Sequence, residues 1–140
     1  MQNLNYGVIG NCSTAALISE KGAIEWLCFP EFDSPSVFAA ILDRQKGGHF
    51  GFKVTSDYKV TQSYVPHTNI LSTHFESEEG AFDVVDFMPC YPTSDGKDFY
   101  RPAEIYRYIR WAKGRPRMKV DYRPAPNYAR GKTIYNVTSQ

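Results

Sequence analysis

The segment from Arg117 to Arg123 constrains the fold of this chain more than any other, because two kinds of side chain alternate along it. Met118, Val120 and Tyr122 are apolar or aromatic, and each lies between charged residues. A period of two is typical of a β-strand that buries one face and leaves the other in water. The alternation predicts a strand with these three side chains on its buried face.

Short apolar runs separated by turn residues indicate further strands along the chain. Runs at 14–19 and 23–29 flank Glu20-Lys21-Gly22, which predicts a β-hairpin. A second hairpin is expected from runs at 103–111 and 117–123, across Lys113-Gly114-Arg115-Pro116. Four further strands are expected to follow one another as an antiparallel meander, at 49–54, 58–64, 70–77 and 81–88.

One short helix is expected from residue 35 to residue 43. Ser34 and Pro35 suit an N-cap and a first helical position, and four apolar residues then share one face at helical spacing, namely Val37, Phe38, Ile41 and Leu42. With about eight strands and no alternation of strands and helices, we predict an all-β, antiparallel β-sandwich. The 140 residues, 42% of them hydrophobic, are enough for one core, so we expect a single domain over 1–140.

Several classes of function lack their motifs. Neither a GxxxxGK[ST] or GxGxxG phosphate loop nor a GxSxG nucleophile elbow occurs. His49, His67 and His74 have no carboxylate or thiol at ligand spacing, so no metal site and no cofactor are expected. The three cysteines fit no zinc or redox spacing either, and we expect reduced, mostly buried thiols.

The apolar stretches are too short to cross a membrane, and the first six residues lack the features of a secretory signal. We therefore expect a cytoplasmic location and no contact with a membrane.

Charge is unevenly distributed, with a net charge of −7 over residues 1–100 and +8 over residues 101–140. One hypothesis is therefore a nucleic-acid-binding β domain with a basic and aromatic surface, formed by Arg107, Arg110, Arg115, Arg117, Lys119 and Arg123 with Tyr106, Tyr108 and Trp111. The alternating cations fit the solvated face of a strand equally well, and the acidic first hundred residues would repel phosphates. Nucleic acid is the disfavoured partner.

Paired carboxylates are of interest because glycosidases use two of them. Glu78 and Glu79 flank a turn glycine and are expected to be solvated, while Asp83 and Asp86 point to opposite faces of one strand and are interpreted as structural. The pair Glu31 and Asp33 lies in a loop fenced by Pro30 and Pro35, beside Phe32. That arrangement resembles the lip of a site, although Asp33 could equally cap the expected helix.

Five motifs in order carry a resemblance to a known family. They are Y-G-V-I-G-N-C-S-T at 6–14, W-L-C-F-P-E-F-D-S-P-S-V-F at 26–38, T-N-I-L at 68–71, D-F-M-P at 86–89 and R-P-A-P-N-Y at 123–128. Together they span nearly the whole chain, and the chain resembles the N-terminal, trehalase-like domain of bacterial and archaeal family 15 glycoside hydrolases. These include glucoamylase-like, glucodextranase-like and trehalase-like enzymes.

The resemblance implies a β-sandwich that precedes and packs on an (α/α)6 barrel, where two glutamates hydrolyse an α-glucosidic bond with inversion. A barrel of about twelve helices of roughly 11 residues does not fit in 140 residues. No catalytic residue is therefore assigned, and the chain alone is expected to be inactive. The family's sandwich is also expected to be incomplete here, so we predict that the isolated chain self-associates.

The resemblance also marks a loop that faces the substrate or the barrel, formed by Trp26, Pro30, Glu31, Phe32, Asp33, Ser34 and Tyr128. The simpler interpretation is that Trp26 and Phe32 are core or domain-interface residues. A different function, a stand-alone carbohydrate-binding module, stays open because aromatic side chains on a sandwich can bind glucan. Starch-like oligosaccharides, dextran and trehalose are all open as the substrate of the parent enzyme.

Overall fold

The computed structural model describes residues 4–55, 57–131, 133 and 134. All strand pairings in this part of the chain are antiparallel. The elements are β1 (Tyr6–Gly10), β2 (Ala15–Ser19), β3 (Ile24–Cys28), β4 (Ser36–Phe38), β5 (His49–Lys53), β6 (Lys59–Tyr64), β7 (Leu71–Glu76), β8 (Gly80–Phe87), β9 (Tyr91–Pro92), β10 (Phe99–Tyr100), β11 (Tyr106–Gly114), β12 (Lys119–Arg123) and α1 (Pro126–Ala129). The described chain contains no helix long and apolar enough to cross a membrane.

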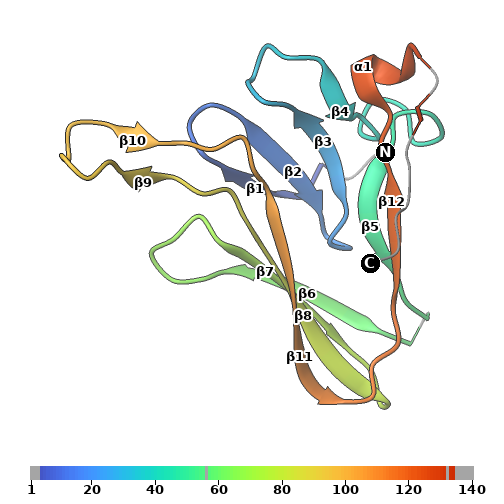
Figure 1. Ribbon diagram of the computed structural model, residues 1–140. Helices are drawn as coiled ribbons and strands as arrows, with labels where there is room; N and C mark the ends of the chain where they lie inside the picture. Colours follow the sequence, from blue (N-terminus) through green and yellow to red (C-terminus); the bar gives the residue numbers. More distant parts are fainter. Residues whose placement is uncertain (1–3, 56, 132, 135–140) are drawn as a thin grey trace.

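Two sheets form the molecule. Sheet A has the order β1-β2-β3-β5-β12, and β4 pairs with the C-terminal end of β3. Sheet B has the order β11-β8-β7-β6. The strands β9 and β10 form a separate two-stranded ribbon that projects away from both sheets (Figure 1). The predicted all-β, sandwich-like fold is therefore confirmed, although its single short helical element is α1 near the end of the described chain, and the hairpin of β2 and β3 lies where the sequence placed it.

The core lies between the sheets. Ile9, Ile18 and Ile24 of sheet A pack with Leu71 of sheet B, and the strictly alternating burial along β7 shows why that segment is a strand. In a second cluster, Phe75 stacks on Phe82 with ring centroids 4.7 Å apart. Each fully buried side chain of this size contributes about 1.5–3 kcal/mol, so these two clusters hold the sheets together.

The predicted helix over residues 35–43 is wrong. Ser36–Phe38 instead form β4 against β3, and the chain then turns so that the Ala39 N–H donates to the Gly47 carbonyl at 2.7 Å. Only glycine fits at position 47, since a Cβ there would lie 2.2 Å from the Ala39 oxygen. So short an apolar run does not distinguish helix from strand, and the edge of β3 decided the outcome.

Two expected strand pairings are also wrong, because consecutive strands cross from one sheet to the other. The arms of the predicted hairpin form β11 and β12, but β11 pairs with β8 and β12 pairs with β5. Pro116, which has no N–H to give to a ladder, lies between them, after a bulge between Trp111 and Lys113. In the predicted meander, β6, β7 and β8 pair in order, whereas the first strand, β5, belongs to sheet A.

The sandwich is open on the side where β11 and β12 end their sheets. Ile109 and Trp111 lie opposite core residues of β8, and Val120 and Tyr122 lie opposite core-facing residues of β5, so all four point between the sheets. They are nevertheless 39%, 67%, 51% and 53% exposed. We call these four residues the open edge. The expectation that Val120 and Tyr122 are buried is wrong, because nothing in the described chain lies beyond them.

Candidate functional site

The loop between β3 and β4 is closed by its own hydrogen bonds. The Ser34 N–H donates to the Glu31 carbonyl at 3.1 Å, and the Glu31 N–H donates to the Ser34 hydroxyl, also at 3.1 Å. The Phe32 N–H donates to the Ser13 carbonyl at 3.0 Å, which ties the loop to the turn between β1 and β2. The loop is therefore held in one shape on the sheet beneath it.

The exposed residues of this loop are Pro30, Glu31, Phe32, Asp33 and Pro35, and Phe32 has 63% of its surface in water. No helix follows, so the expectation that Asp33 caps one is wrong. The interpretation of Phe32 as a core residue is wrong as well, and its position at a domain interface or beside the substrate stays a prediction. An apolar ring fixed between two carboxylates on a closed loop suits contact with another surface.

Trp26 and Tyr128, far apart in the sequence, come together beside this loop. Their ring centroids are 6.3 Å apart, and the Tyr128 N–H donates to the buried Ser36 hydroxyl at 3.0 Å. The negative charge that the Cys28 sulfur carries when deprotonated, together with a hydrogen bond to it, raises the pKa of Tyr128. The ring of Tyr128, 44% exposed, thus adds a neutral aromatic surface to the loop.

The turn that presents Tyr128 is strained. Asn127, Tyr128 and Ala129 have φ values of 54°, 56° and 59°, so α1 is not a regular right-handed helix. Left-handed backbone at non-glycine residues costs on the order of 1–2 kcal/mol each, and such strain is concentrated at functional sites. The strain supports the inclusion of Tyr128 in the candidate site.

Sequence reasoning missed the turn of residues 11–14 that supports the loop. The buried Asn11 side chain accepts from the N–H groups of Ser13 and Thr14, both at 3.0 Å, and donates to the Pro102 carbonyl at 3.1 Å. Asparagine side chains commonly accept from the backbone N–H two residues on, so Asn11 itself was a signal for such a turn. We call this end of sheet A, with residues 10–14, 26–36 and 125–129, the loop end.

The thiols differ from the expectation. None is in a disulfide, but only Cys28 is buried, while Cys12 and Cys90 are exposed. Among the described residues, no three His, Cys, Asp or Glu side chains converge where they could hold a metal ion.

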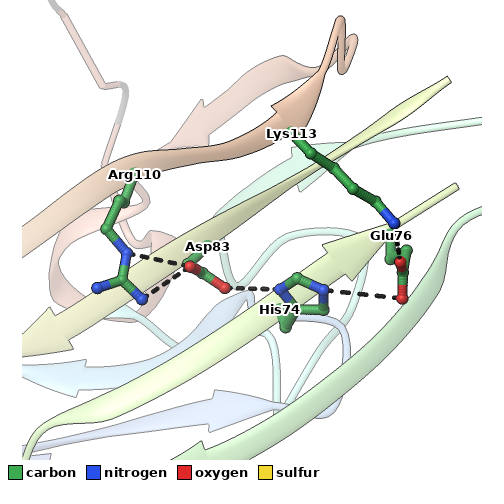
Figure 2. Close-up of polar contacts among 5 residues, drawn as sticks. All are labelled: His74, Glu76, Asp83, Arg110 and Lys113. Atoms are coloured by element: carbon green, nitrogen blue, oxygen red, sulfur yellow. Dashed lines mark hydrogen bonds and ion pairs between the residues drawn. The ribbon is translucent and has the colours of Figure 1, made fainter.

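Asp83, one of the carboxylates considered above, lies on the outer face of sheet B. Figure 2 shows it between His74, whose Nδ1 is 2.7 Å away, and Arg110, whose Nη2 is 2.9 Å away. Burial alone would raise the pKa of Asp83, but the hydrogen bonds from His74 and Arg110 outweigh it and lower the pKa. The chain of contacts continues from His74 through Glu76 to Lys113. Both oxygens of Asp83 are therefore engaged by neighbouring side chains, in keeping with its interpretation as a structural carboxylate.

Asp86 points to the other face, as predicted, and is bonded by Arg107 in the core. Arg107 therefore does not belong to a solvated basic face, which corrects the interpretation of the alternating cations. Among the other cations of that group, Arg110 and Arg123 pair with Asp83 and Asp121. Because β11 and β12 belong to different sheets, these cations do not lie on one hairpin as the sequence predicted.

Comparison with known proteins identifies the chain. The profile of the family described as trehalase-like, N-terminal, matches residues 5–139. The chain belongs to the trehalase-like N-terminal family. The resemblance stated from the sequence motifs is confirmed.

Curated relatives of this trehalase-like domain are much longer proteins. A trehalase of Thermoplasma volcanium is 36% identical over 132 residues, which are 92% of this chain and 20% of that protein. A trehalase of Sulfolobus acidocaldarius, trehalase 1, is 51% identical over 85 residues, 59% of this chain and 14% of that protein. A trehalase of Mycolicibacterium smegmatis is 40% identical over 95 residues, 65% of this chain and 14% of that protein. No solved structure matches this trehalase-like domain.

The chain therefore spans a fifth or less of the length of these relatives. The motif W-L-C-F-P-E-F-D-S-P-S-V-F, which carried much of the resemblance, builds the loop end of this trehalase-like domain.

Proposed function

We propose that this chain is the non-catalytic N-terminal domain of a larger glycoside hydrolase that cleaves an α-glucosidic bond with inversion. The observation that carries the proposal is the family match over residues 5–139, together with much longer relatives that are named trehalases and of which this chain matches a fifth or less. A 140-residue sandwich has no room for the catalytic barrel. In this proposal the catalytic glutamates belong to an (α/α)6 barrel in the same polypeptide.

The surface that packs on that barrel is, in this proposal, the loop end. Trp26 and Tyr128 provide an aromatic base, and a closed loop of Pro30, Glu31, Phe32, Asp33 and Ser34 stands above it. A closed loop loses little conformational entropy on docking, and the exposed Phe32 ring gains the most from burial. This domain would thereby hold the barrel and shield its active site on one side.

The name that the relatives share favours trehalose over α-glucans or dextran as the substrate of the parent enzyme. A cytoplasmic location remains part of the proposal.

The size of the endogenous polypeptide tests the proposal first. An antibody raised against this domain should detect a band several times larger than 16.0 kDa, and the immunoprecipitate should release glucose from trehalose. Maltose and isomaltose serve as competing substrates in the same assay. A single band at the size of this chain, with no glucosidase activity in the immunoprecipitate, would contradict the proposal and support a stand-alone module.

A further inference from the structure

Three hollows at the end of sheet A opposite the loop end run into one another. The largest, about 600 Å³, lies between the edge strands β1 and β6. A hollow of about 130 Å³ shares Asn5, Tyr6 and Glu20 with it, and a third of about 260 Å³ shares Lys21 and Glu25 with the second. Because neighbouring hollows share lining residues, we treat the three as one groove beside the turn between β2 and β3.

The walls of the groove are held in place before any ligand arrives. Tyr64 of β6 reaches β1, where its hydroxyl accepts from the Val8 N–H at 2.7 Å and donates to the Val8 carbonyl at 2.8 Å. Gln62 of β6 reaches the other wall and donates to the Ser19 carbonyl at 2.9 Å. Since these bonds join the two sheets across the groove, its width is set by the fold.

The polar groups of the groove carry both signs of charge. Glu20 and Glu25 lie beside Lys21 and Arg44 around the ring of Tyr6. The Tyr6 hydroxyl donates to Glu25 at 2.6 Å, and burial together with this bond raises the pKa of Tyr6 to about 12, so the phenol stays protonated. The Asn5 amide donates to Glu20, which orients that carboxylate at the rim.

We propose that this groove binds a neutral oligosaccharide. Sugar hydroxyls donate and accept, so they can satisfy carboxylates and cations on the same wall, while tyrosine rings offer apolar faces to the sugar rings. An anionic ligand would be repelled by the carboxylates of Glu20 and Glu25, and a cationic ligand would be repelled by Lys21 and Arg44. A binding site of this kind requires no catalytic group.

An extended peptide is a poorer occupant than a sugar. A peptide would bind by adding a strand to the exposed edge of β1. The Tyr64 hydroxyl already takes both backbone groups of Val8, and the Asn69 amide donates to the Gly10 carbonyl at 2.9 Å. Three backbone groups along this edge are therefore already bonded to side chains, which leaves a peptide fewer positions for a regular ladder.

The groove goes beyond the proposed function and does not depend on it. Tyr6 and Ser19 lie at the groove end of strands β1 and β2, whereas Gly10 and Ala15 lie at the loop end of the same strands. A barrel docked on the loop end would leave the groove open to solvent. Binding is also measurable on this chain alone, so its failure would leave the proposed function standing.

The test is a titration of the ¹⁵N-labelled 140-residue chain with trehalose, maltotriose and cellotriose, followed by amide chemical shifts. We expect saturable shifts at residues 5–7, 19–25, 44 and 60–64 with a Kd on the order of 1 mM, and none with heparin oligosaccharides at the same sites. The variant Trp111→Ser is titrated in parallel, so that self-association at the open edge does not hide binding. No saturable shift with any of the three sugars at about ten times that concentration would overturn the proposal.

Two double variants locate the site. Replacing Glu20 and Arg44 with glutamine removes one carboxylate and one cation from the groove and should weaken binding by at least about fivefold. The matched control replaces Glu78 and Lys97, which are exposed elsewhere, with glutamine and should leave the affinity unchanged. Equal affinity in both double variants, or shifts confined to the open edge or the loop end, would place any binding outside the groove.

Discussion

Arg107 of β11 and Asp86 of β8 form a bidentate ion pair in the core, with Nε to Oδ1 at 2.7 Å and Nη2 to Oδ2 at 3.0 Å. Both side chains are almost fully buried, 3% and 0% exposed. The same guanidinium donates to the carbonyls of Gly22 and Phe50 in sheet A, and it lies 4.7 Å from the Phe50 ring centroid. One side chain of sheet B thus satisfies backbone groups of sheet A, which fixes how the two sheets face each other.

Breaking this pair should cost much of the stability of the domain. Asp86→Asn leaves the buried Arg107 charge without its carboxylate, and loss of one partner of a buried pair costs about 3–5 kcal/mol. Urea unfolding followed by tryptophan fluorescence measures the loss. The matched control is Asp83→Asn, because Asp83 and Arg110 pair across the same two strands but on the outer face, where Arg110 is largely exposed. The control should lose no more than about 1 kcal/mol, and equal losses would contradict the assignment.

Asp121 should make the stability depend on acid pH. Hydrogen bonds from His49, and then from Lys53 and Arg123, lower the pKa of Asp121 in the folded chain despite some burial. A group whose pKa is lower in the folded state adds stability above its unfolded pKa and loses it as pH falls. The stability difference between the natural chain and Asp121→Asn should therefore be largest near neutral pH and shrink below about pH 4. Urea unfolding at a series of pH values measures it, and a difference that grows on acidification would contradict the prediction.

The open edge should cause the isolated chain to self-associate. Ile109, Trp111, Val120 and Tyr122 expose apolar surface beside two strands, β11 and β12, that each have one unpaired side in the described chain. Light scattering coupled to chromatography should show a mass above 16.0 kDa that rises with concentration.

The double variant Trp111→Ser with Val120→Thr should shift that mass toward the monomer, because it makes the open edge more polar. Phe99→Ser is the control, since Phe99 is equally exposed but lies on the ribbon of β9 and β10. A sharp monomer peak of the natural chain at high concentration would count against the prediction.

In the proposed parent enzyme, the loop end should stabilise the protein without taking part in its chemistry. In the parent, Phe32→Ser removes the exposed ring of the loop and should lower the Tm of the whole protein, while kcat changes little. Asp33→Ala should leave both kcat and KM unchanged. A raised KM in either variant would instead place the loop beside the substrate.

Much of the strand content follows from local sequence. The run at 70–77, bounded by turn residues, and the glycine-containing turn between residues 19 and 24 predicted β7 and the hairpin of β2 and β3. The same reasoning missed β1, β9 and β10, because the glycines of β1 and the short ribbon give weak periodic signals. It also assigned a helix to residues 35–43, where four apolar residues satisfied helical spacing by chance.

The candidate site was only partly predictable. The motif at 26–38 marked the loop, but nothing local indicated that Tyr128 would lie against Trp26, or that Asn11 would support the loop from below. Contacts between residues so far apart depend on the order of strands in the sheets. Arg107 is a similar case, since its alternation with apolar residues is typical of a solvated strand face, yet it is buried.

The sequence by itself determined that this chain is all-β, where most of its strands lie and which family it belongs to, because turn residues, period-two burial and local motifs are properties of neighbouring residues. Only the tertiary structure decided which strands pair, since β5 and β12 join sheet A while β6, β7, β8 and β11, which lie between them in the sequence, build sheet B. Pairing is decided by the free energy of burying whole faces and satisfying groups such as Arg107 across the sheets, and no single segment encodes that balance.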